Sequence, residues 1–220
     1  MLAQEGLSEW QLVYDVDPGD ERSADAITGW LIDQFGVPEL DGPVRVSVST
    51  GGAAAARNRG ILQARSPAFV NLDGDDLLLD GALQRVSESL ETGARFGLSN
   101  TVELVEGLAE MSVYREVGHE FFDEVHGPGW LKRCWLEVLP EYTNPARLTT
   151  LHARRSDYLD AGGYSPMPRC EEMLLLRNLD HTGGLRILGS PTHGYRSHSA
   201  SVTSEPGDAL GDVQWDALWS

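Results

Sequence analysis

The first half of the chain alternates short apolar runs with segments that have a helical pattern. In chain order, strand-like and helical segments follow one another at residues 11–14, 23–35, 44–48, 53–64, 68–72 and 81–90. This alternation is typical of βαβ units, in which helices cover a mainly parallel sheet. We therefore predict an α/β fold with a mixed, mainly parallel sheet that is flanked by helices.

The second half carries the same kinds of element at less regular spacing. Strands are predicted at 96–104, 148–153 and 185–188, and helices at 128–139, 156–159 and 171–179. A chain of 220 residues fits one domain and can bury enough surface to fold without disulfides or a structural metal. We expect one domain over residues 1–200 and a locally packed tail over residues 201–220.

The charge of the chain excludes two classes of partner. Its 34 acidic and 17 basic residues give a formal net charge of −17, whereas nucleic acids and anionic membranes are bound through Lys and Arg. No apolar run approaches the roughly 18 residues of a membrane span, and the first ten residues lack the features of a secretory signal. Cys134 and Cys170 are the only cysteines, which fits a reducing compartment. We expect a cytoplasmic protein.

One segment departs from the acidic background. Residues 51–70 contain Arg57, Arg59 and Arg65 and no acidic residue. Arginine side chains suit phosphate because the guanidinium group presents several N–H donors in a planar fork. The segment is therefore a candidate site for an anion.

An acidic run follows the third predicted strand directly. Asp73-Gly74-Asp75-Asp76 would emerge at the carboxyl end of that strand, where open α/β sheets place their ligands. Paired carboxylates suit a hard cation such as Mg²⁺ or Mn²⁺. Leu77 and Leu78 occupy positions where an EF-hand loop needs a ligand and a glycine, so a calcium loop of that type is excluded. The alternative interpretation is an acidic turn that caps the next helix.

Five motifs occur in a fixed order over about residues 8–200. They are Trp10-Gln11-Leu12-Val13-Tyr14 with Asp15 and Asp17, Ala56-Arg57-Asn58-Arg59-Gly60-Ile61, Leu72-Asp73-Gly74-Asp75-Asp76, Gly162-Gly163-Tyr164 with Glu171-Glu172, and Tyr195-Arg196-Ser197-His198. In this order and spacing the chain resembles the family 2 glycosyltransferases of the GT-A fold, whose acidic strand end is a DxD motif. The order of the motifs is far more specific than any one of them.

The resemblance implies a nucleotide-diphosphate sugar as donor, Mn²⁺ or Mg²⁺ as cofactor and a hydroxyl group as acceptor. It implies that Asp73 and Asp75 contact the donor and its metal, with Asp75 as the direct metal ligand. Arg57 would face the nucleotide or its phosphates. Asp17 would contact the base or the ribose, although Asp15 fits the motif nearly as well. A metal at this place would neutralise the departing diphosphate.

The resemblance also implies which residues carry the catalysis. Glu172 occupies the position of the general base, an aspartate in most of the family, that takes the acceptor proton in a single inverting displacement. Glu171 is a second candidate. Acidic residues at the start of a helix also complement its dipole, which is the alternative interpretation of both. His198 is a candidate to complete the metal shell, and His193 is a weaker one.

The chain departs from the family at its start. Family members begin with a strand that forms one wall of the nucleotide pocket, whereas this sequence opens at what corresponds to the next helix. Three explanations are open: the strand is left out at the start of the sequence, a partner chain such as a second copy supplies an equivalent, or the chain is a degenerate relative that no longer turns over the donor. We therefore predict a metal-dependent inverting glycosyltransferase, with a non-catalytic GT-A-like binding module as the alternative.

Overall fold

The computed structural model of the chain describes residues 12–16, 26, 29, 33, 44–48, 52–105, 111–113, 122–133, 147–166 and 171–197. Asp17, His198 and the predicted tail lie outside these residues. Of the helix predicted at 23–35, residues 26, 29 and 33 are described, and all three are helical.

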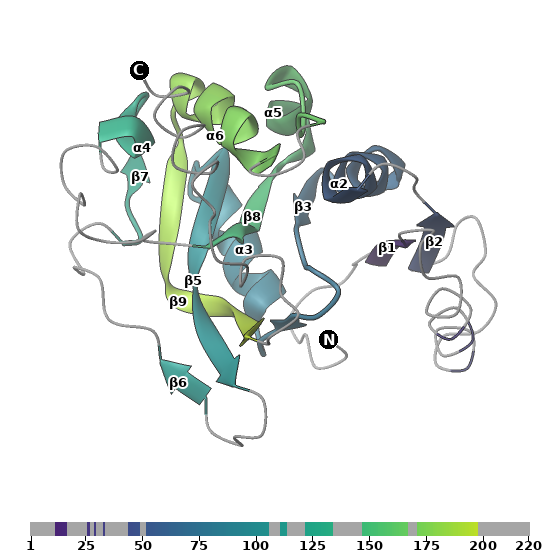
Figure 1. The fold of residues 1–220 in the computed structure, drawn as a ribbon. Coiled ribbons are helices and arrows are strands. Elements are labelled where there is room, and N and C mark those ends of the chain that lie inside the picture. The colour runs from purple at the N-terminus through teal and green to yellow at the C-terminus, as the bar shows by residue number, and fades with distance from the viewer. Residues whose placement is uncertain are drawn as a thin grey trace, which may run out of the picture.

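The described strands form two sheets (Figure 1). In the smaller sheet, β1 (Leu12–Val16) pairs in parallel with β2 (Val44–Val48). The larger sheet has the order β3 (Ala68–Val70), β8 (Arg147–Arg154), β5 (Phe96–Val105), β9 (Leu185–Ser197) and β4 (Leu77–Leu78), with β6 (Met111–Val113) on β5 and β7 (Val125–His126) on β9.

The predicted α/β class with a mixed sheet is confirmed, but the balance of strand directions differs from the expectation. Within the larger sheet only β5 and β9 pair in parallel, while β8 runs antiparallel to both β3 and β5. For β8 to pair in parallel with β3 or β5, the chain would have to cross back to the end of the sheet at which those strands begin. The strands β4, β6 and β7 were not predicted, because two or three residues are too few to show an alternating pattern.

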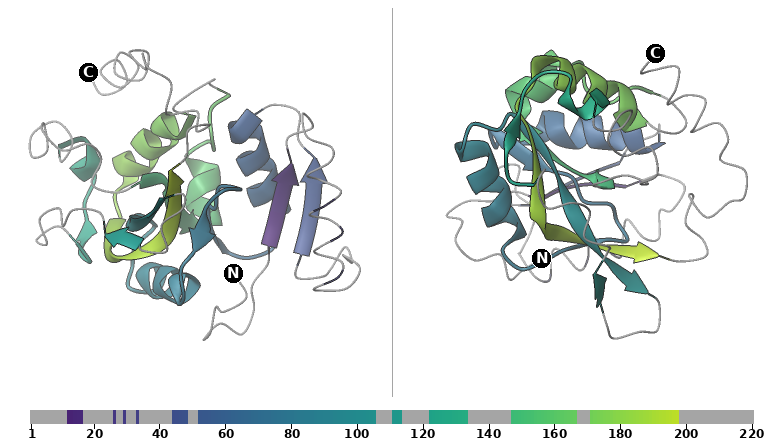
Figure 2. Two further views of the ribbon diagram at one scale, coloured as in Figure 1. Left: turned by 60° about the horizontal axis from the view of Figure 1, so that its bottom comes forward. Right: turned by 90° about the vertical axis from the view of Figure 1, so that its left-hand side faces the viewer.

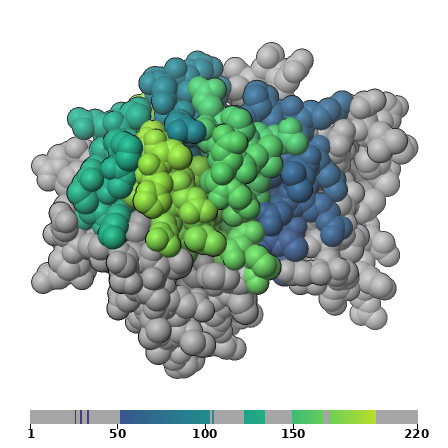
Figure 3. Space-filling view, turned by 90° about the horizontal axis from the view of Figure 1, so that it is seen from above, coloured from purple at the N-terminus to yellow at the C-terminus, as the bar shows by residue number. Residues whose placement is uncertain are grey.

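Helices cover both faces of the larger sheet (Figure 2). The helices of one face are α2 (Gly52–Gln63), α4 (Trp130–Arg133), α5 (Arg155–Asp160) and α6 (Glu171–Thr182), and Figure 3 shows them next to one another. The opposite face carries α3 (Ala82–Glu91). The core lies between the sheet and the first group, because Phe96 and Leu98 of β5 pack there against Leu175 and Leu176 of α6.

Gly97 of β5 faces α3 and is closely surrounded. A Cβ atom at this position would lie 2.3 Å from Nε2 of His152 and 2.5 Å from the backbone oxygen of Arg186. His152 is fully buried, and burial lowers its pKa to about 4, so the neutral ring fills the space between β8 and α3. Neither neighbour has room to move, because one is a buried ring and the other is backbone in the adjacent strand.

We expect Gly97→Ala to lower the free energy of unfolding by about 3 kcal/mol, because an added methyl group overpacks this contact. For a domain of this size the melting temperature should fall by about 6 to 12 °C, which thermal unfolding followed by circular dichroism would measure. Gly127→Ala is the matched control, since a Cβ there meets nothing within 4 Å. Equal melting temperatures for both variants would contradict the prediction, because they would mean that β5 and β8 move apart around the added methyl group without a loss of stability.

The two sheets do not pair with each other among the described strands. The smaller sheet lies beyond β3, on the side away from β8 (Figures 1 and 2), and α2 packs against β1. No described strand pairs with the edge of β1 opposite β2 or with the edge of β3 opposite β8.

Candidate active site

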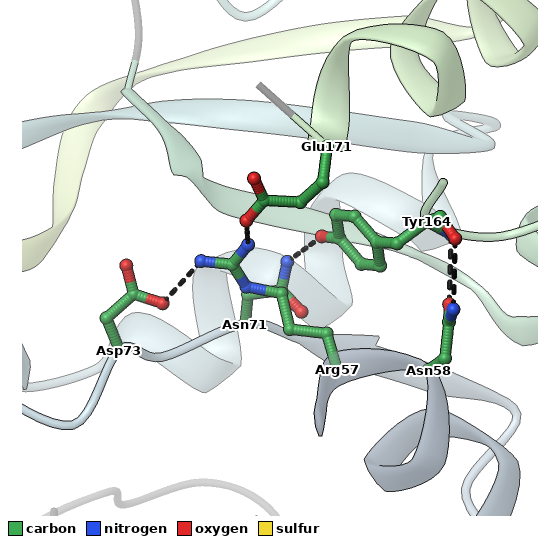
Figure 4. Close-up of polar contacts among 6 residues, drawn as sticks. All are labelled: Arg57, Asn58, Asn71, Asp73, Tyr164 and Glu171. Carbon is green, nitrogen blue, oxygen red and sulfur yellow. Dashed lines mark hydrogen bonds and ion pairs between the residues drawn. The ribbon is translucent and has the colours of Figure 1, made fainter. Parts of the chain in front are cut away.

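Arg57 joins three segments that are distant in the sequence (Figure 4). Its Nη2 atom donates a hydrogen bond of 2.8 Å to Oδ1 of Asp73, in the loop after β3. Its Nη1 atom donates to Oε1 of Glu171, the first residue of α6. The exposed fractions of the Arg57, Asp73 and Glu171 side chains are 16%, 30% and 12%, so this ion-paired cluster is largely shielded from water.

The cluster keeps Arg57 charged. Burial alone would lower the pKa of the guanidinium group, but the attraction of Asp73, with a smaller contribution from Glu171, raises that pKa above its ordinary value. One cation therefore faces two carboxylates. The two printed bonds use one N–H of each Nη atom, and a guanidinium group has five N–H donors.

Tyr164 lies beneath this cluster. Cζ of Arg57 is 5.4 Å from the centroid of the Tyr164 ring, a distance that fits a cation–π contact. Asn58, the next residue of α2, holds the backbone of Tyr164: its Oδ1 atom accepts from the Tyr164 N–H at 2.9 Å and its Nδ2 atom donates to the Tyr164 carbonyl at 3.0 Å. Gly163 permits this approach, because its φ is +73° and a Cβ would lie 3.0 Å from Oδ1 of Asn58.

Glu172 carries the most perturbed carboxyl group beside the cluster. Burial, and after it the charge of the adjacent Glu171, raises the pKa of Glu172 from 4.5 to about 7. Its Oε2 atom is buried and has no hydrogen-bond partner among the described residues. Leaving a buried polar atom unpaired costs roughly 1 to 3 kcal/mol, so such an atom in a native fold calls for an explanation. A carboxyl group that titrates near neutral pH is suited to accept a proton from a substrate.

The acidic run after β3 divides into three different environments. Asp73 pairs with Arg57, Asp75 is exposed, and Asp76 is buried. Arg196 near the end of β9 holds the acidic run in place with two hydrogen bonds. Its backbone N–H donates to Oδ1 of Asp76 at 2.9 Å, and its Nε donates to the carbonyl of Asp75 at 3.0 Å. The chain therefore passes the acidic run two residues before His198.

A metal site is not preformed in the part of the chain that the structure describes. There, no group of three or more His, Cys, Asp or Glu side chains is arranged to hold a metal ion. The exposed carboxylate of Asp75 and the partly exposed one of Asp73 nevertheless have the oxygen chemistry that Mg²⁺ and Mn²⁺ require. The donor set fits an ion that substrate oxygens would complete, and it does not fit a cage made by protein alone.

The structure brings four of the predicted site residues together: Arg57, Asp73, Glu171 and Glu172. The backbone of Asp15 lies in β1, but its side chain, like all of Asp17 and His198, lies outside what the structure describes. The functional roles of all these residues stay predictions.

Sequence reasoning did not predict the contacts that Asn58, Asn71 and His193 make around the site. Asn58 was visible only as a letter of the motif around Arg57. His193 was considered as a metal ligand, whereas it is fully buried and bonded to backbone and hydroxyl groups.

Comparisons with solved structures confirm a GT-A-like α/β fold. A crystal structure of TarS residues 1–349 from S. aureus matches with a TM-score of 0.58 and 13% identity, covering 90% of this chain and 54% of that one. Another crystal structure of S. aureus TarS gives a TM-score of 0.53 and 12% identity, covering 87% of this chain and 37% of that one. This chain thus spans about half or less of the length of these structures, and at such identities the likeness concerns the fold alone.

Residues 20–112 match the sequence model of glycosyl transferase family 2, so the resemblance predicted from the motifs is confirmed over this segment. The matched segment contains Arg57, Asp73 and Asp75 and ends before Tyr164, Glu171 and Glu172. This match supports glycosyl transfer in general terms. No curated protein sequence matches the chain. Among the described helices, none combines the length and the apolar character needed to cross a membrane.

Proposed function

We propose that this protein transfers a sugar from a nucleotide-diphosphate donor to an acceptor hydroxyl group, in one inverting displacement that depends on a divalent metal. The observation that carries the proposal is Glu172. Its carboxyl group is buried, its pKa is raised to about 7, and one of its oxygen atoms has no partner among the described residues. These are the properties expected of a general base that accepts the proton of an acceptor hydroxyl group.

The surroundings of Glu172 support this role. The ion pair between Arg57 and Glu171 holds the first residue of α6, so the position of the next carboxyl group is fixed relative to α2. Arg57 also forms an ion pair with Asp73, so the position of the acidic run is fixed relative to Glu172. A donor bound at the acidic run and an acceptor at Glu172 would therefore meet in a defined geometry, which is the main requirement for a single displacement.

Asp75 and Asp73 would hold the metal, with His198 as a further candidate ligand. Arg196 of β9 is hydrogen-bonded to Asp75 and Asp76. When bound, the metal would supply positive charge to the departing diphosphate, which the acidic protein itself does not provide. We propose Asp17, or Asp15, as the contact to the nucleoside.

A second candidate function is a non-catalytic module that binds the nucleotide sugar together with a partner chain. The observation in its favour is the interruption between β1 and β3, because a pocket wall formed by a strand would lie there. In this alternative, the purified chain would bind the nucleotide, and no sugar would be transferred.

The proposal is tested by the melting temperature of the purified chain with nucleoside diphosphates. A diphosphate of uridine or thymidine at 100 times its dissociation constant, together with Mn²⁺, should stabilise the protein by about 2.7 kcal/mol. For a domain of this size that corresponds to a rise of about 5 to 10 °C in the melting temperature. Mn²⁺ alone and the corresponding monophosphate serve as controls, and both should give much smaller shifts.

The Asp75→Asn variant makes the test specific, because it removes the proposed metal ligand without changing its shape. It should lose the shift that depends on Mn²⁺ and keep the melting temperature of the unliganded protein. The absence of a shift with every nucleoside diphosphate at millimolar concentration would refute donor binding. A shift without release of nucleoside diphosphate from any nucleotide sugar would instead favour the non-catalytic module.

A further inference from the structure

His193 of β9 is a fully buried histidine with hydrogen bonds on both ring nitrogens. Nε2 lies 2.7 Å from the backbone oxygen of Asn71, and Nδ1 lies 2.7 Å from the hydroxyl oxygen of Thr192. A carbonyl oxygen only accepts, so Nε2 must carry the proton. Burial lowers the pKa of His193, and the ring is therefore neutral. Nδ1 of a neutral ring then accepts the proton of Thr192.

The network extends from His193 to β5. The hydroxyl oxygen of Thr192 is also in contact with that of Ser99 of β5, whose hydroxyl group donates to the carbonyl of Asn100 at 3.1 Å. Within this group of buried polar side chains, His193 is the one that donates to the carbonyl of Asn71. A leucine at position 193 would fill the core without any of these polar groups, so packing does not explain them.

Asn71 connects the network to the candidate active site. It lies between β3 and Asp73, and its backbone N–H donates to the carbonyl of Leu151 at 2.9 Å. Its side-chain amide donates to the hydroxyl group of Tyr164. One buried residue therefore fixes both the loop that leads to Asp73 and the far end of the Tyr164 ring, and its own carbonyl is held by His193.

Tyr164 connects Asn71 to Arg57. Asn58 holds the backbone of Tyr164, and Asn71 holds its hydroxyl group, so the ring is fixed at both ends (Figure 4). The guanidinium group of Arg57 lies over that ring and bonds to Asp73 and Glu171. The rotation of the ring and the position of Asp73 together decide where Arg57 can meet both carboxylates.

We propose that His193 is a positioning residue that acts through Asn71 to hold Tyr164 and Asp73 where Arg57 bonds to them. The coupling between His193 and Tyr164 is a property of the unliganded protein. Its effect on catalysis rests on the proposed function.

The coupling is tested without any ligand by NMR of the protein with ¹³C-labelled tyrosine. The chain has six tyrosines, and the Tyr164 signal is identified by its absence in Tyr164→Phe. We expect this signal to move in His193→Leu, although two hydrogen bonds separate the residues. It should stay in place in His193→Gln, because the glutamine amide can donate to the same carbonyl. An unmoved Tyr164 signal in His193→Leu would overturn the proposal.

The reciprocal measurement covers the case in which His193→Leu does not fold. Tyr164→Phe removes one hydroxyl group, and we expect it to move the ¹⁵N signals of the His193 ring, one of six histidines in the chain. Unchanged ¹⁵N signals would overturn the coupling as well. This second measurement needs no variant of the buried histidine.

The effect on function is then measured as kcat/KM for the nucleotide sugar. We expect a loss of about 10- to 100-fold in His193→Leu, because misplacing groups by an ångström can cost about 100-fold, and near wild-type values in His193→Gln. Equal loss in both variants would indicate a packing role and contradict the proposal. An inactive wild-type protein would instead refute the proposed function, while the NMR measurements would still decide the coupling.

Discussion

Glu172→Gln is expected to lower the rate of sugar transfer by about 10²- to 10⁴-fold, the usual contribution of a general base. The amide has nearly the shape of the carboxyl group and does not take up the acceptor proton. Donor binding should change little, because the proposed donor contacts are Asp73, Asp75 and Arg57. The measurement is kcat/KM with saturating acceptor, together with the melting-temperature shift given by nucleoside diphosphate and Mn²⁺.

The pH dependence gives a second readout of the same group. The base must be deprotonated to act, so kcat/KM of the wild type should rise with pH, with a midpoint near the raised pKa of about 7, and then level off. The effect on stability has the opposite sign. A carboxyl group whose pKa is raised by folding stabilises the fold below its unfolded pKa of 4.5, and this contribution is lost as the pH rises through about 7. Glu172→Gln should therefore melt at a higher temperature than the wild type above pH 7.

Two variants make these results specific to Glu172. Glu124→Gln removes an exposed carboxylate and should leave both the rate and the pH profile unchanged. Glu171→Gln should lose mainly stability, because Glu171 holds Arg57. If Glu171→Gln lost activity while Glu172→Gln kept it, the general base would be Glu171.

The sequence was sufficient for the parts of the fold that depend on local patterns. The helices around Arg57 and Glu172 were predicted within three residues of their ends, and the apolar strand before Asp73 was found by its pattern. The direction of β8 was not predictable in this way, because strand direction depends on how the chain connects across the sheet and not on the strand's own residues.

The candidate site shows a similar division. Motif order predicted Arg57 and Asp73 for one site, and it predicted the nucleotide or its phosphates as the partner of Arg57, which stays a prediction. The structure pairs Arg57 with two carboxylates, one of which is 114 residues away. Asn71 had no signal in the sequence, and His193 was considered only as a metal ligand, because the contacts of a single buried polar residue with distant strands follow no periodicity.

Arg57→Met is expected to destabilise the protein by about 2 to 4 kcal/mol, because it leaves two largely buried carboxylates facing each other without a cation. The melting temperature should fall by roughly 5 to 15 °C. The loss is measured by thermal unfolding at pH 7. Arg59→Met is the matched control, since Arg59 is exposed on the same helix and interactions of exposed charges contribute much less to stability than buried ones.

A triple variant separates the two roles of Arg57. Combining Arg57→Met with Asp73→Asn and Glu171→Gln removes both negative charges with the positive one, and replacing a complete buried ion pair is often nearly neutral for stability. We expect the triple variant to regain most of the lost stability and to remain unable to bind a nucleoside diphosphate. If it stayed as unstable as Arg57→Met, packing of the arginine on Tyr164 would be its main contribution. If it bound the nucleotide like the wild type, then neither Arg57 nor Asp73 would contact the donor, and the nucleotide site would have to lie elsewhere in the fold.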